Sequence, residues 1–515
     1  MSGVGRRPDS VIGERAVWFW AGSAAITAGV LLHLPMLSHA HAMGNHLAGM
    51  AMDPWMYLGM ALIAAGAPLA CYGALPKRKP RHADDAGTSY EARNSTPLNR
   101  WHAGVLVVLT LGLVIDVMKP ATLGFVLPGM IGEYGITPAT AALLPLVALI
   151  GTTVGSFMWG WLADVYGRRV SILLSTILFV STAICGAMPA FEWNLVMCFL
   201  MGASAGGMLP VVYALLAEVM PPRHRSWVLV LVGGTGLVGG YLAASAAAHL
   251  FEPVFGWRAL WLQGFPTGLL LLALARLIPE SPRFLAEQGR HAELARMRQR
   301  YGIVPRERAP PPEDAPVAHE RHGRLTLALT IAALSWSFVN FGLLLWLPSD
   351  LQARGYSAEL ASGTIASSAL VALPTVMLAA WLYSRWSSKW TLVGMIALTL
   401  AGLVGALLPP ELLVWDPLLL GVIAMLIMGT NGMIAVLLPY TAENYPLGTR
   451  GRATGLIAGS SKFGGVAVQL FALLGLIPTL GGTALALLLP MAASGGLVAW
   501  AGRETRGRSL RDLEA

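Results

Sequence analysis

The sequence predicts an all-α membrane protein with about fourteen spanning helices. Hydrophobic residues make up 55% of the chain and charged residues only 12%, and the mean hydropathy is +0.62. Apolar runs of roughly 20 residues, each long enough to cross a bilayer as a helix, recur along all 515 residues. They leave no room for a sizeable soluble domain, so the lipid bilayer is the first partner that we expect.

Basic residues are spread over alternate short loops. The formal net charge of +8 could indicate nucleic acid, but arginines and lysines flank every second connection between apolar runs. This is the positive-inside pattern, so we expect a multi-pass protein of the cytoplasmic (inner) membrane with both termini in the cytoplasm and no nucleic-acid partner. The cysteines, Cys71, Cys185 and Cys198, all lie in apolar runs, which argues against a disulfide framework.

Residues 1–100 are predicted to form two extra transmembrane helices and a cytoplasmic linker. The outer loop between these helices is rich in histidine and methionine, whose side chains suit copper and other soft metal ions. The candidate metal ligands are His39, His41, Met43 and His46. The alternative is that they are ordinary interfacial residues, since no spacing here is as diagnostic as paired Cys-x2-Cys.

The remaining apolar runs form two halves that repeat. Glu218 and Arg225 of EVMPPRHR recur as Glu443 and Arg450 of ENYPLGTR, 225 residues later (443 − 218). Glu280 of PESPRFL recurs as Glu504 of ETRGRSL at almost the same offset. Duplicated six-helix bundles are the simplest explanation, and such repeats place a ligand site at their interface near the midplane.

The domain boundaries follow from this repeat. The predicted units are an N-terminal bundle at 101–278, a cytoplasmic central loop at 279–324, a C-terminal bundle at 325–502 and a cytoplasmic tail at 503–515.

The loop GSFMWGWLADVYGRR carries the pattern G-x3-D-x2-G-R-R, formed by Gly160, Asp164, Gly167, Arg168 and Arg169. This pattern resembles the loop signature of the major facilitator superfamily. PESPRFL, ETRGRSL, FGWRALW and LLWLPSDL are similar to its branch of sugar porters, organic-ion transporters and metabolite:proton symporters. The resemblance covers about residues 103–510 and implies twelve core helices in two bundles that rock about a central site.

Charge contacts at these loops are expected to act as a conformational gate. Asp164 with Arg168 and Arg169 can form contacts that one state keeps and the other breaks, while Gly155 and Gly160 are expected to let helices approach closely. Ser384 and Ser387 replace the aspartate and glycine in the second half, which weakens the prediction of a symmetric gate. The other residues assigned to the gate are Gly167, Glu218, Arg225, Glu280, Arg283, Glu443, Arg450 and Glu504.

Asp116 and Lys119 interrupt an apolar run, and Pro120 follows directly. Each charge alone would cost roughly 2.5–3.5 kcal/mol at the bilayer centre, and residues three apart on a helix can reach each other. We expect this helix to line the translocation cavity. Lys119 would attract an anionic group of the substrate, and Asp116 would serve as its counter-ion or as a proton site. The alternative is a fixed ion pair that only locks helices together.

Three more polar residues within predicted spans are candidates for substrate binding or coupling. Lys462 lies among glycines in GSSKFGGVAVQL, and a second lysine inside the membrane suggests a substrate with a carboxylate. It could instead extend to the cytoplasmic surface. Asn340 and Asn431 either contact substrate or bridge helices by hydrogen bonds.

These observations together predict a secondary transporter that takes up a small organic solute, an anionic metabolite, by alternating access. The chain lacks G-x4-G-K-[ST], the motif that would hold ATP phosphates. Proton coupling stays open, because Cys198 stands where related symporters often have an arginine in R-x3-G. The alternatives are a copper transporter that uses the His/Met loop and a non-transporting sensor. We expect no enzymatic activity, no cofactor and a monomer.

Overall fold

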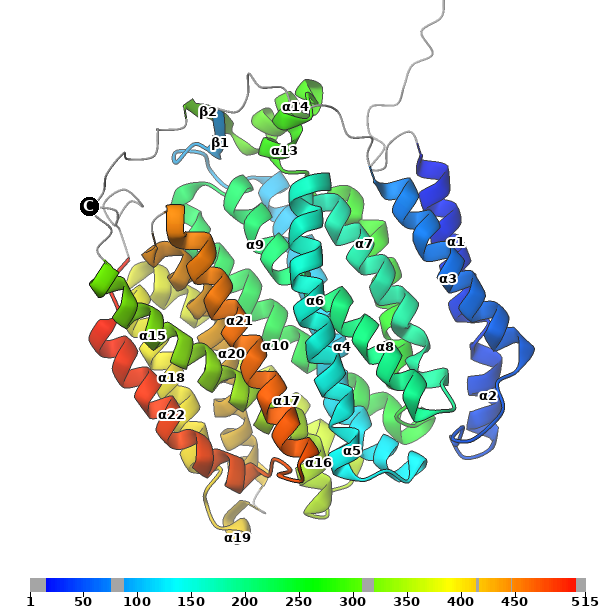
Figure 1. The fold of residues 1–515 in the computed structure, drawn as a ribbon. Coiled ribbons are helices and arrows are strands. Elements are labelled where there is room, and N and C mark those ends of the chain that lie inside the picture. Colours follow the sequence, from blue (N-terminus) through cyan, green and yellow to red (C-terminus); the bar gives the residue numbers. More distant parts are fainter. Residues whose placement is uncertain (1–14, 76–87, 308–318, 414–415, 446, 506–515) are drawn as a thin grey trace, which may run out of the picture.

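Long apolar helices run between two ends of the molecule that differ in character (Figure 1). The computed structural model describes residues 15–75, 88–307, 319–413, 416–445 and 447–505. One end carries the strands β1 and β2 and the short helices α13 and α14, and we call it the ribbon end. We call the opposite end the far end.

The first half contains six spanning units that alternate in direction. Its first helix, α4, begins after Asn99, whose side chain accepts hydrogen bonds from the amides of Trp101 and His102, and it ends at Gly135. The units of this half are α4 (Arg100–Tyr134), α5 and α6 (Pro138–Ala141, Leu143–Tyr166), α7 and η2 (Arg168–Ser181, Thr182–Ala187), α8 and α9 (Phe191–Ala205, Met208–Val219), α10 (Pro222–Phe255), and α11, α12 and η3 (Ala259–Leu262, Gly264–Leu274, Ala275–Leu277).

The second half repeats this arrangement. Its first unit is interrupted by a π-helical segment, η4, in which the chain makes wider turns than an α-helix. The units are α15, η4 and α16 (His319–Ser337, Phe338–Leu344, Leu345–Ala353), α17 (Ala358–Arg385), α18 (Ser388–Gly405), α20 (Asp416–Asn444), α21 (Leu447–Leu473) and α22 (Leu480–Ala501), with the short α19 (Pro410–Leu413) between α18 and α20.

The helix inventory confirms the predicted fold class. Within the described ranges, 13 helices are long and apolar enough to cross a membrane, and Ala259–Leu274 is a shorter apolar segment. Two of these helices precede the first half, as expected, and the other eleven form the two six-unit halves together with the shorter segment. The protein is therefore a multi-pass membrane protein.

Small residues bring α6 and α8 into backbone contact. A Cβ atom on Gly155 would lie 2.1 Å from the carbonyl oxygen of Ala203, and one on Gly202 would lie 1.9 Å from that of Ala148. Close approach of this kind is how helices associate inside a bilayer, where no hydrophobic effect drives them together. Gly160 has no atom within 4 Å of its Cβ position, so the expected close approach at Gly160 is wrong.

The halves meet along α10 and at the far end. On Gly234 of α10, a Cβ would lie 2.6 Å from Val376 of α17. At the far end a Cβ on Gly124 of α4 would lie 2.5 Å from the carbonyl oxygen of Leu345. Close by, the hydroxyl of Tyr241 donates to the carbonyl oxygen of Leu344 at 2.9 Å. The far ends of the two halves are thus in direct contact.

The N-terminal extension forms a helical hairpin beside the first half. It consists of α1 (Ala16–Leu31), the short α2 (Leu34–Ala42) and α3 (Pro54–Ala74), and it packs against α7 (Figure 1). A Cβ on Gly73 of α3 would lie 2.1 Å from the backbone nitrogen of Phe19, so α1 and α3 pack as tightly as α6 and α8.

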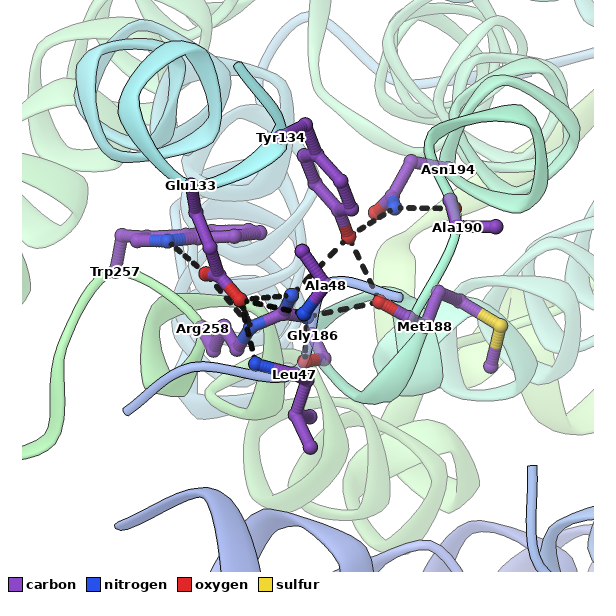
Figure 2. A network of polar contacts seen from close by, with 10 residues as sticks. All are labelled: Leu47, Ala48, Glu133, Tyr134, Gly186, Met188, Ala190, Asn194, Trp257 and Arg258. Carbon is purple, nitrogen blue, oxygen red and sulfur yellow. Dashed lines mark hydrogen bonds and ion pairs between the residues drawn. The ribbon is translucent and has the colours of Figure 1, made fainter. Parts of the chain in front are cut away.

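The loop that connects α2 to α3 is anchored to the far end of the first half. Figure 2 shows the backbone amides of Leu47 and Ala48 donating to Oε1 of Glu133, at 2.6 and 3.0 Å. Glu133 also forms a salt bridge of 2.7 Å with Arg258, and both side chains are 3% exposed or less. Trp257 donates its indole N–H to Oε2 of the same carboxylate at 2.9 Å. One buried carboxylate therefore joins α4, the segment before α11 and the hairpin.

The linker after the hairpin is anchored at the ribbon end. Its strand β1 (Thr88–Ala92) pairs antiparallel with β2 (Ile303–Glu307), which follows α13 (Pro282–Glu287) and α14 (His291–Tyr301) of the central loop. Asn99 adds a bond from its side-chain amide to the carbonyl oxygen of Arg300 at 2.7 Å. The sequence predicted a linker and a loop here, without strands.

Glu133→Gln tests whether the buried carboxylate holds the hairpin in place. Removing one charge from a buried pair leaves the other uncompensated and costs on the order of 3 kcal/mol. We expect a lower melting temperature and faster hydrogen exchange at the amides of Leu47 and Ala48. Glu411→Gln, on the exposed face of α19, is the matched control and should change neither. Unchanged exchange at both amides in Glu133→Gln would contradict the anchoring role.

Candidate functional site

Lys119 is sealed between helices of the first half. Its side chain is 0% exposed, and Nζ donates to the carbonyl oxygen of Phe179 at 2.7 Å and to Oγ1 of Thr182 at 2.5 Å. The ammonium also lies 4.5 Å from the centre of the Phe179 ring. No salt bridge joins it to Asp116 in the described part of the chain. The structure therefore corrects two expectations, that Lys119 faces a cavity and that it pairs with Asp116.

The position of Lys119 has a local explanation. The helix α7 ends at Ser181 and continues as the tighter 3-10 helix η2. In a continuous α-helix each carbonyl group accepts a hydrogen bond from the backbone amide four residues later in the chain. At such a junction the carbonyl groups lose these partners. A cation near the end of a helix also interacts favourably with the helix dipole. Lys119 supplies both the donor and the charge, so its contacts are those of a structural residue.

Asp116 is placed differently, near the interface between the halves. It is 8% exposed, and no hydrogen bond to its carboxylate occurs among the described residues. Its charge interacts with that of Lys462 on α21, in the other half. Lys462 is only partly buried. Asp116 also borders a narrow cavity, with room for about one water molecule, lined by Ile115, Ser175, Thr176, Phe179, Met208 and Leu271.

The two asparagines predicted as candidates also differ in their burial and hydrogen bonding. Asn431 is 4% exposed and donates its side-chain amide to the carbonyl oxygen of Ile427, within its own helix. Asn340 lies in η4, is partly exposed, and forms no side-chain hydrogen bond within the described ranges. Asn340 thus leaves its whole side-chain amide without a hydrogen bond among the described residues, whereas Asn431 uses its side-chain nitrogen.

Polar contacts around η4 link three helices. The side-chain amide of Gln469 on α21 donates to the carbonyl oxygen of Phe341 at 2.8 Å, and Trp346 donates its indole N–H to Gln469 at 3.2 Å. Tyr241 reaches the carbonyl oxygen of Leu344 from the first half. Sequence reasoning missed Tyr241, because a tyrosine in an apolar run gives no signal that its hydroxyl crosses to the other half.

At the ribbon end, Glu280 caps the first turn of α7. Its Oε1 accepts hydrogen bonds from the backbone amides of Arg168 and Ser281 at 2.8 and 2.9 Å. A carboxylate at the start of a helix stabilises it through the free amides and the dipole. Gly167 makes this approach possible, since its φ is +101° and a Cβ there would lie 2.5 Å from Oε2 of Glu280.

Arg168 also forms a salt bridge of 2.5 Å with Glu218 on α9. Asp164, expected to contact Arg168, is exposed instead and makes no ion pair among the described residues. Arg283 is 61% exposed and pairs with Glu287 one turn further along α13, at 2.9 Å. In the signature loop, Arg168 therefore pairs with Glu218, and the expected contacts of Asp164 are not found among the described residues.

The second half keeps the same cap despite its altered loop. Glu504 accepts from the backbone amide of Ser388 at 3.0 Å and from its hydroxyl at 2.7 Å, and it also bonds to the hydroxyl of Ser387. It stands at the first turn of α18 as Glu280 stands at that of α7. Ser387 has an extended backbone with φ −161°, so no glycine is needed there.

Glu443 joins the two halves at the ribbon end. Its Oε1 accepts from the hydroxyl of Ser226 on α10 at 2.7 Å, and its Oε2 accepts from Tyr383 at 2.6 Å. Arg225 interacts electrostatically with both Glu443 and Glu218. The side chain of Arg450, the counterpart of Arg225 in the repeat, lies outside the described residues.

The predicted metal ligands do not converge. His39, His41, Met43 and His46 are all exposed, and His41 contacts the side chain of Asn45 at 3.1 Å. Residues two apart on a helix, such as His39 and His41, point in different directions. The described residues contain no group of three or more His, Cys, Asp or Glu that could hold a metal ion. The arrangement therefore does not support the copper alternative.

Comparisons with known proteins agree with this architecture. The family model described as Major Facilitator Superfamily matches residues 106–469. The niacin transporter NiaP of Acinetobacter baylyi is 28% identical over 440 residues, which cover 81% of this chain and 97% of that protein. The 4-hydroxybenzoate transporter PcaK of Pseudomonas aeruginosa is 29% identical over 395 residues, covering 72% of this chain and 86% of that protein.

Solved structures show the same fold. The proton:xylose symporter XylE bound to 6-bromo-6-deoxy-D-glucose aligns with a TM-score of 0.60 at 18% identity, covering 80% of this chain and 98% of that chain. A partially occluded inward open conformation of the xylose transporter XylE from E. coli aligns with a TM-score of 0.61 at 15% identity, covering 80% and 100%.

The matching family model spans most of the chain, and the relatives are matched over nearly their whole lengths. The signature loop, the repeated carboxylate caps and the two six-unit halves are all present. The chain belongs to the major facilitator superfamily and is a membrane transporter rather than an enzyme.

Proposed function

We propose that this protein is a secondary transporter that takes up a small aromatic carboxylate by alternating access. The relatives matched over most of their length include transporters named for niacin, 4-hydroxybenzoate and gallate. Each of these compounds is a single aromatic ring with one carboxyl group. The shared chemistry, a flat ring and one negative charge, defines the substrate class that we propose for this chain.

The observation that carries the proposal is the electrostatic interaction between Asp116 and Lys462, which we call the charge pair although no salt bridge joins the two side chains among the described residues. The two residues belong to different halves, and their charges interact across the interface. Charges inside a bilayer are costly unless they are partnered or face water, and repeats of this kind hold ligands at their interface. Lys462 would therefore bind the substrate carboxylate, with Asp116 as its partner in the empty carrier.

Proton coupling follows from the charge count at this site. A bound carboxylate and Asp116 would place two negative charges beside one ammonium, and like charges at short range disfavour each other. A proton on Asp116 would remove the conflict. We propose that the substrate anion and a proton enter together, so that an inward pH gradient drives uptake.

The orientation of the protein completes the proposal. The positive-inside rule assigns the ribbon end to the cytoplasm of a bacterial inner membrane, with both termini on that side. The contacts of Gly124 and Tyr241 with the backbone of α16 and η4 would then form the closed outer gate. The carboxylate caps Glu280 and Glu504 would stabilise the helix ends at the cytoplasmic side. We propose that the carrier works as a monomer.

Lys462→Gln tests the carboxylate site. Loss of the ammonium should raise the KM for nicotinate uptake into proteoliposomes at least ten-fold, because a charged hydrogen bond to a carboxylate is worth about 1.5–3 kcal/mol. Lys462→Arg should restore part of the affinity.

The controls are Lys389→Gln, at the ribbon end of α18, and Lys119→Gln. Lys119→Gln should lower the melting temperature while the folded protein keeps its KM. An unchanged KM in Lys462→Gln would refute the site.

Asp116→Asn separates binding from coupling. The amide keeps the shape of the side chain but carries neither the charge nor the transferable proton. We expect loss of accumulation driven by a pH gradient, while exchange of nicotinate across the membrane without a gradient continues. Both rates can be measured in the same proteoliposomes. Accumulation that still follows the pH gradient in Asp116→Asn would show that another group carries the proton.

A further inference from the structure

One buried tryptophan near the charge pair has an unused hydrogen-bond donor. Trp336 on α15 is 7% exposed, and within the described part of the chain its buried Nε1 has no partner. A buried indole N–H almost always finds an acceptor in a folded protein, because leaving it unpaired is unfavourable. At an interface that takes up and releases a solute, the solute itself can supply the missing acceptor atom.

Trp336 and Lys462 lie at the same level along the packed helices α15 and α21. The hydroxyl of Ser337 donates to the backbone carbonyl of Ser461 on α21. Trp336 directly precedes Ser337, and Lys462 directly follows Ser461. A Cβ on Gly464 would lie 2.9 Å from the side chain of Ser337, so the two helices are in close contact here. Trp336 and Lys462 are therefore the immediate chain neighbours of one contact between α15 and α21.

The segment that carries Trp336 lies at the interface between the halves. Trp336, Asn340 and Leu344 follow one another at four-residue spacing, which puts them on one side of this segment. Tyr241 of the first half donates to the carbonyl oxygen of Leu344, the last of the three. The neighbouring face holds Ser337 and Phe341 against α21. Trp336 and Asn340 thus share one side of a segment that contacts the first half.

An aromatic surface accompanies this donor. The rings of Trp336 and Phe341 pack edge to face, with centroids 5.8 Å apart and an interplanar angle of 81°. Phe341 is partly exposed and borders Gly465, where a Cβ would lie 2.7 Å from its ring. Aromatic rings favour such offset and edge contacts with one another. A flat ring held beside Lys462 would meet this pair.

We infer that Trp336 is a specificity-determining residue, whose indole N–H donates to an acceptor atom on the substrate ring while Lys462 binds the carboxylate. The inference rests on the proposed function and narrows it. A pyridine nitrogen is such an acceptor and a benzene C–H is not, so the site selects pyridine carboxylates over benzoates. Asn340, on the same face, supplies a second polar group near the ring.

The test compares nicotinate with benzoate as competitors of labelled nicotinate uptake in proteoliposomes. The wild type should have about ten-fold higher apparent affinity for nicotinate, since a site with a buried donor rejects an analogue that cannot satisfy it. Trp336→Phe keeps an aromatic ring but removes the N–H. We expect this variant to bind both compounds with apparent affinities within about two-fold, through weaker binding of nicotinate and unchanged binding of benzoate.

Trp261→Phe is the matched control. Trp261 also has a buried indole N–H without a partner among the described residues, but it packs beside Gly186 within the first half. This variant should keep the preference for nicotinate. A preference retained in Trp336→Phe would overturn the inference while leaving the proposed function intact. Failure of the wild type to transport either compound would instead refute the proposed function itself.

The wild type offers a second test if Trp336→Phe does not fold. Picolinate and isonicotinate carry the ring nitrogen at other distances from the carboxylate than nicotinate does. With Lys462 and Trp336 at fixed positions, only one placement of the nitrogen satisfies both, so the three isomers should differ in apparent affinity by several-fold. Equal affinities for the three isomers and benzoate would overturn the inference.

Discussion

A charge inside a bilayer must have a partner, and where that partner lies determines what the charge can do. Lys119 takes its partners, Phe179 and Thr182, from its own half, so the contact survives when the halves move against each other. The charges of Asp116 and Lys462 interact across the interface, which movement of the halves can weaken. A residue that sits inside one rigid half stabilises that half. In the proposed function, a pair that spans the interface is exchanged for a substrate, which would give Asp116 a transport role and Lys119 a structural one on the same helix.

The contacts at the ribbon end also divide into those within one half and those between the halves. Glu280 and Glu504 each accept hydrogen bonds from a helix start within their own half, and this arrangement is repeated although the loop in the second half has lost its glycine. What the duplication preserved is the carboxylate at the helix end, because the free amides there need an acceptor whatever the loop sequence is. Glu443 differs, since it bonds to Ser226 of the other half. In the proposed alternating access, this bond between the halves would be one of those that open and close.

The sequence predicted the parts of the structure that depend on local pattern. Apolar runs predict spans because crossing a bilayer requires about 20 apolar residues, and the offset between Glu280 and Glu504 correctly indicated a repeat. Contacts between distant segments were not predictable. Spacing allowed Asp116 to reach Lys119, but the partners that each residue has come from other helices. The pairing of β1 with β2 was not predicted, because short polar strands pair with residues far away in the sequence. The π-helix was missed because one extra residue in a turn hardly alters an apolar pattern.

The N-terminal extension is attached to the first half of the protein and to the central loop. The family match begins at residue 106, so the hairpin and β1 lie outside the shared fold. Two anchors tie them down: the amides of Leu47 and Ala48 bind Glu133 at the far end, and β1 pairs with β2 at the ribbon end. Both anchors belong to the first half or to the central loop. Under the proposed alternating access, these anchors would make the extension travel with the first half. The six spanning units of the second half, which include Lys462, would then move against a body formed by the first half, which holds Asp116, and the hairpin.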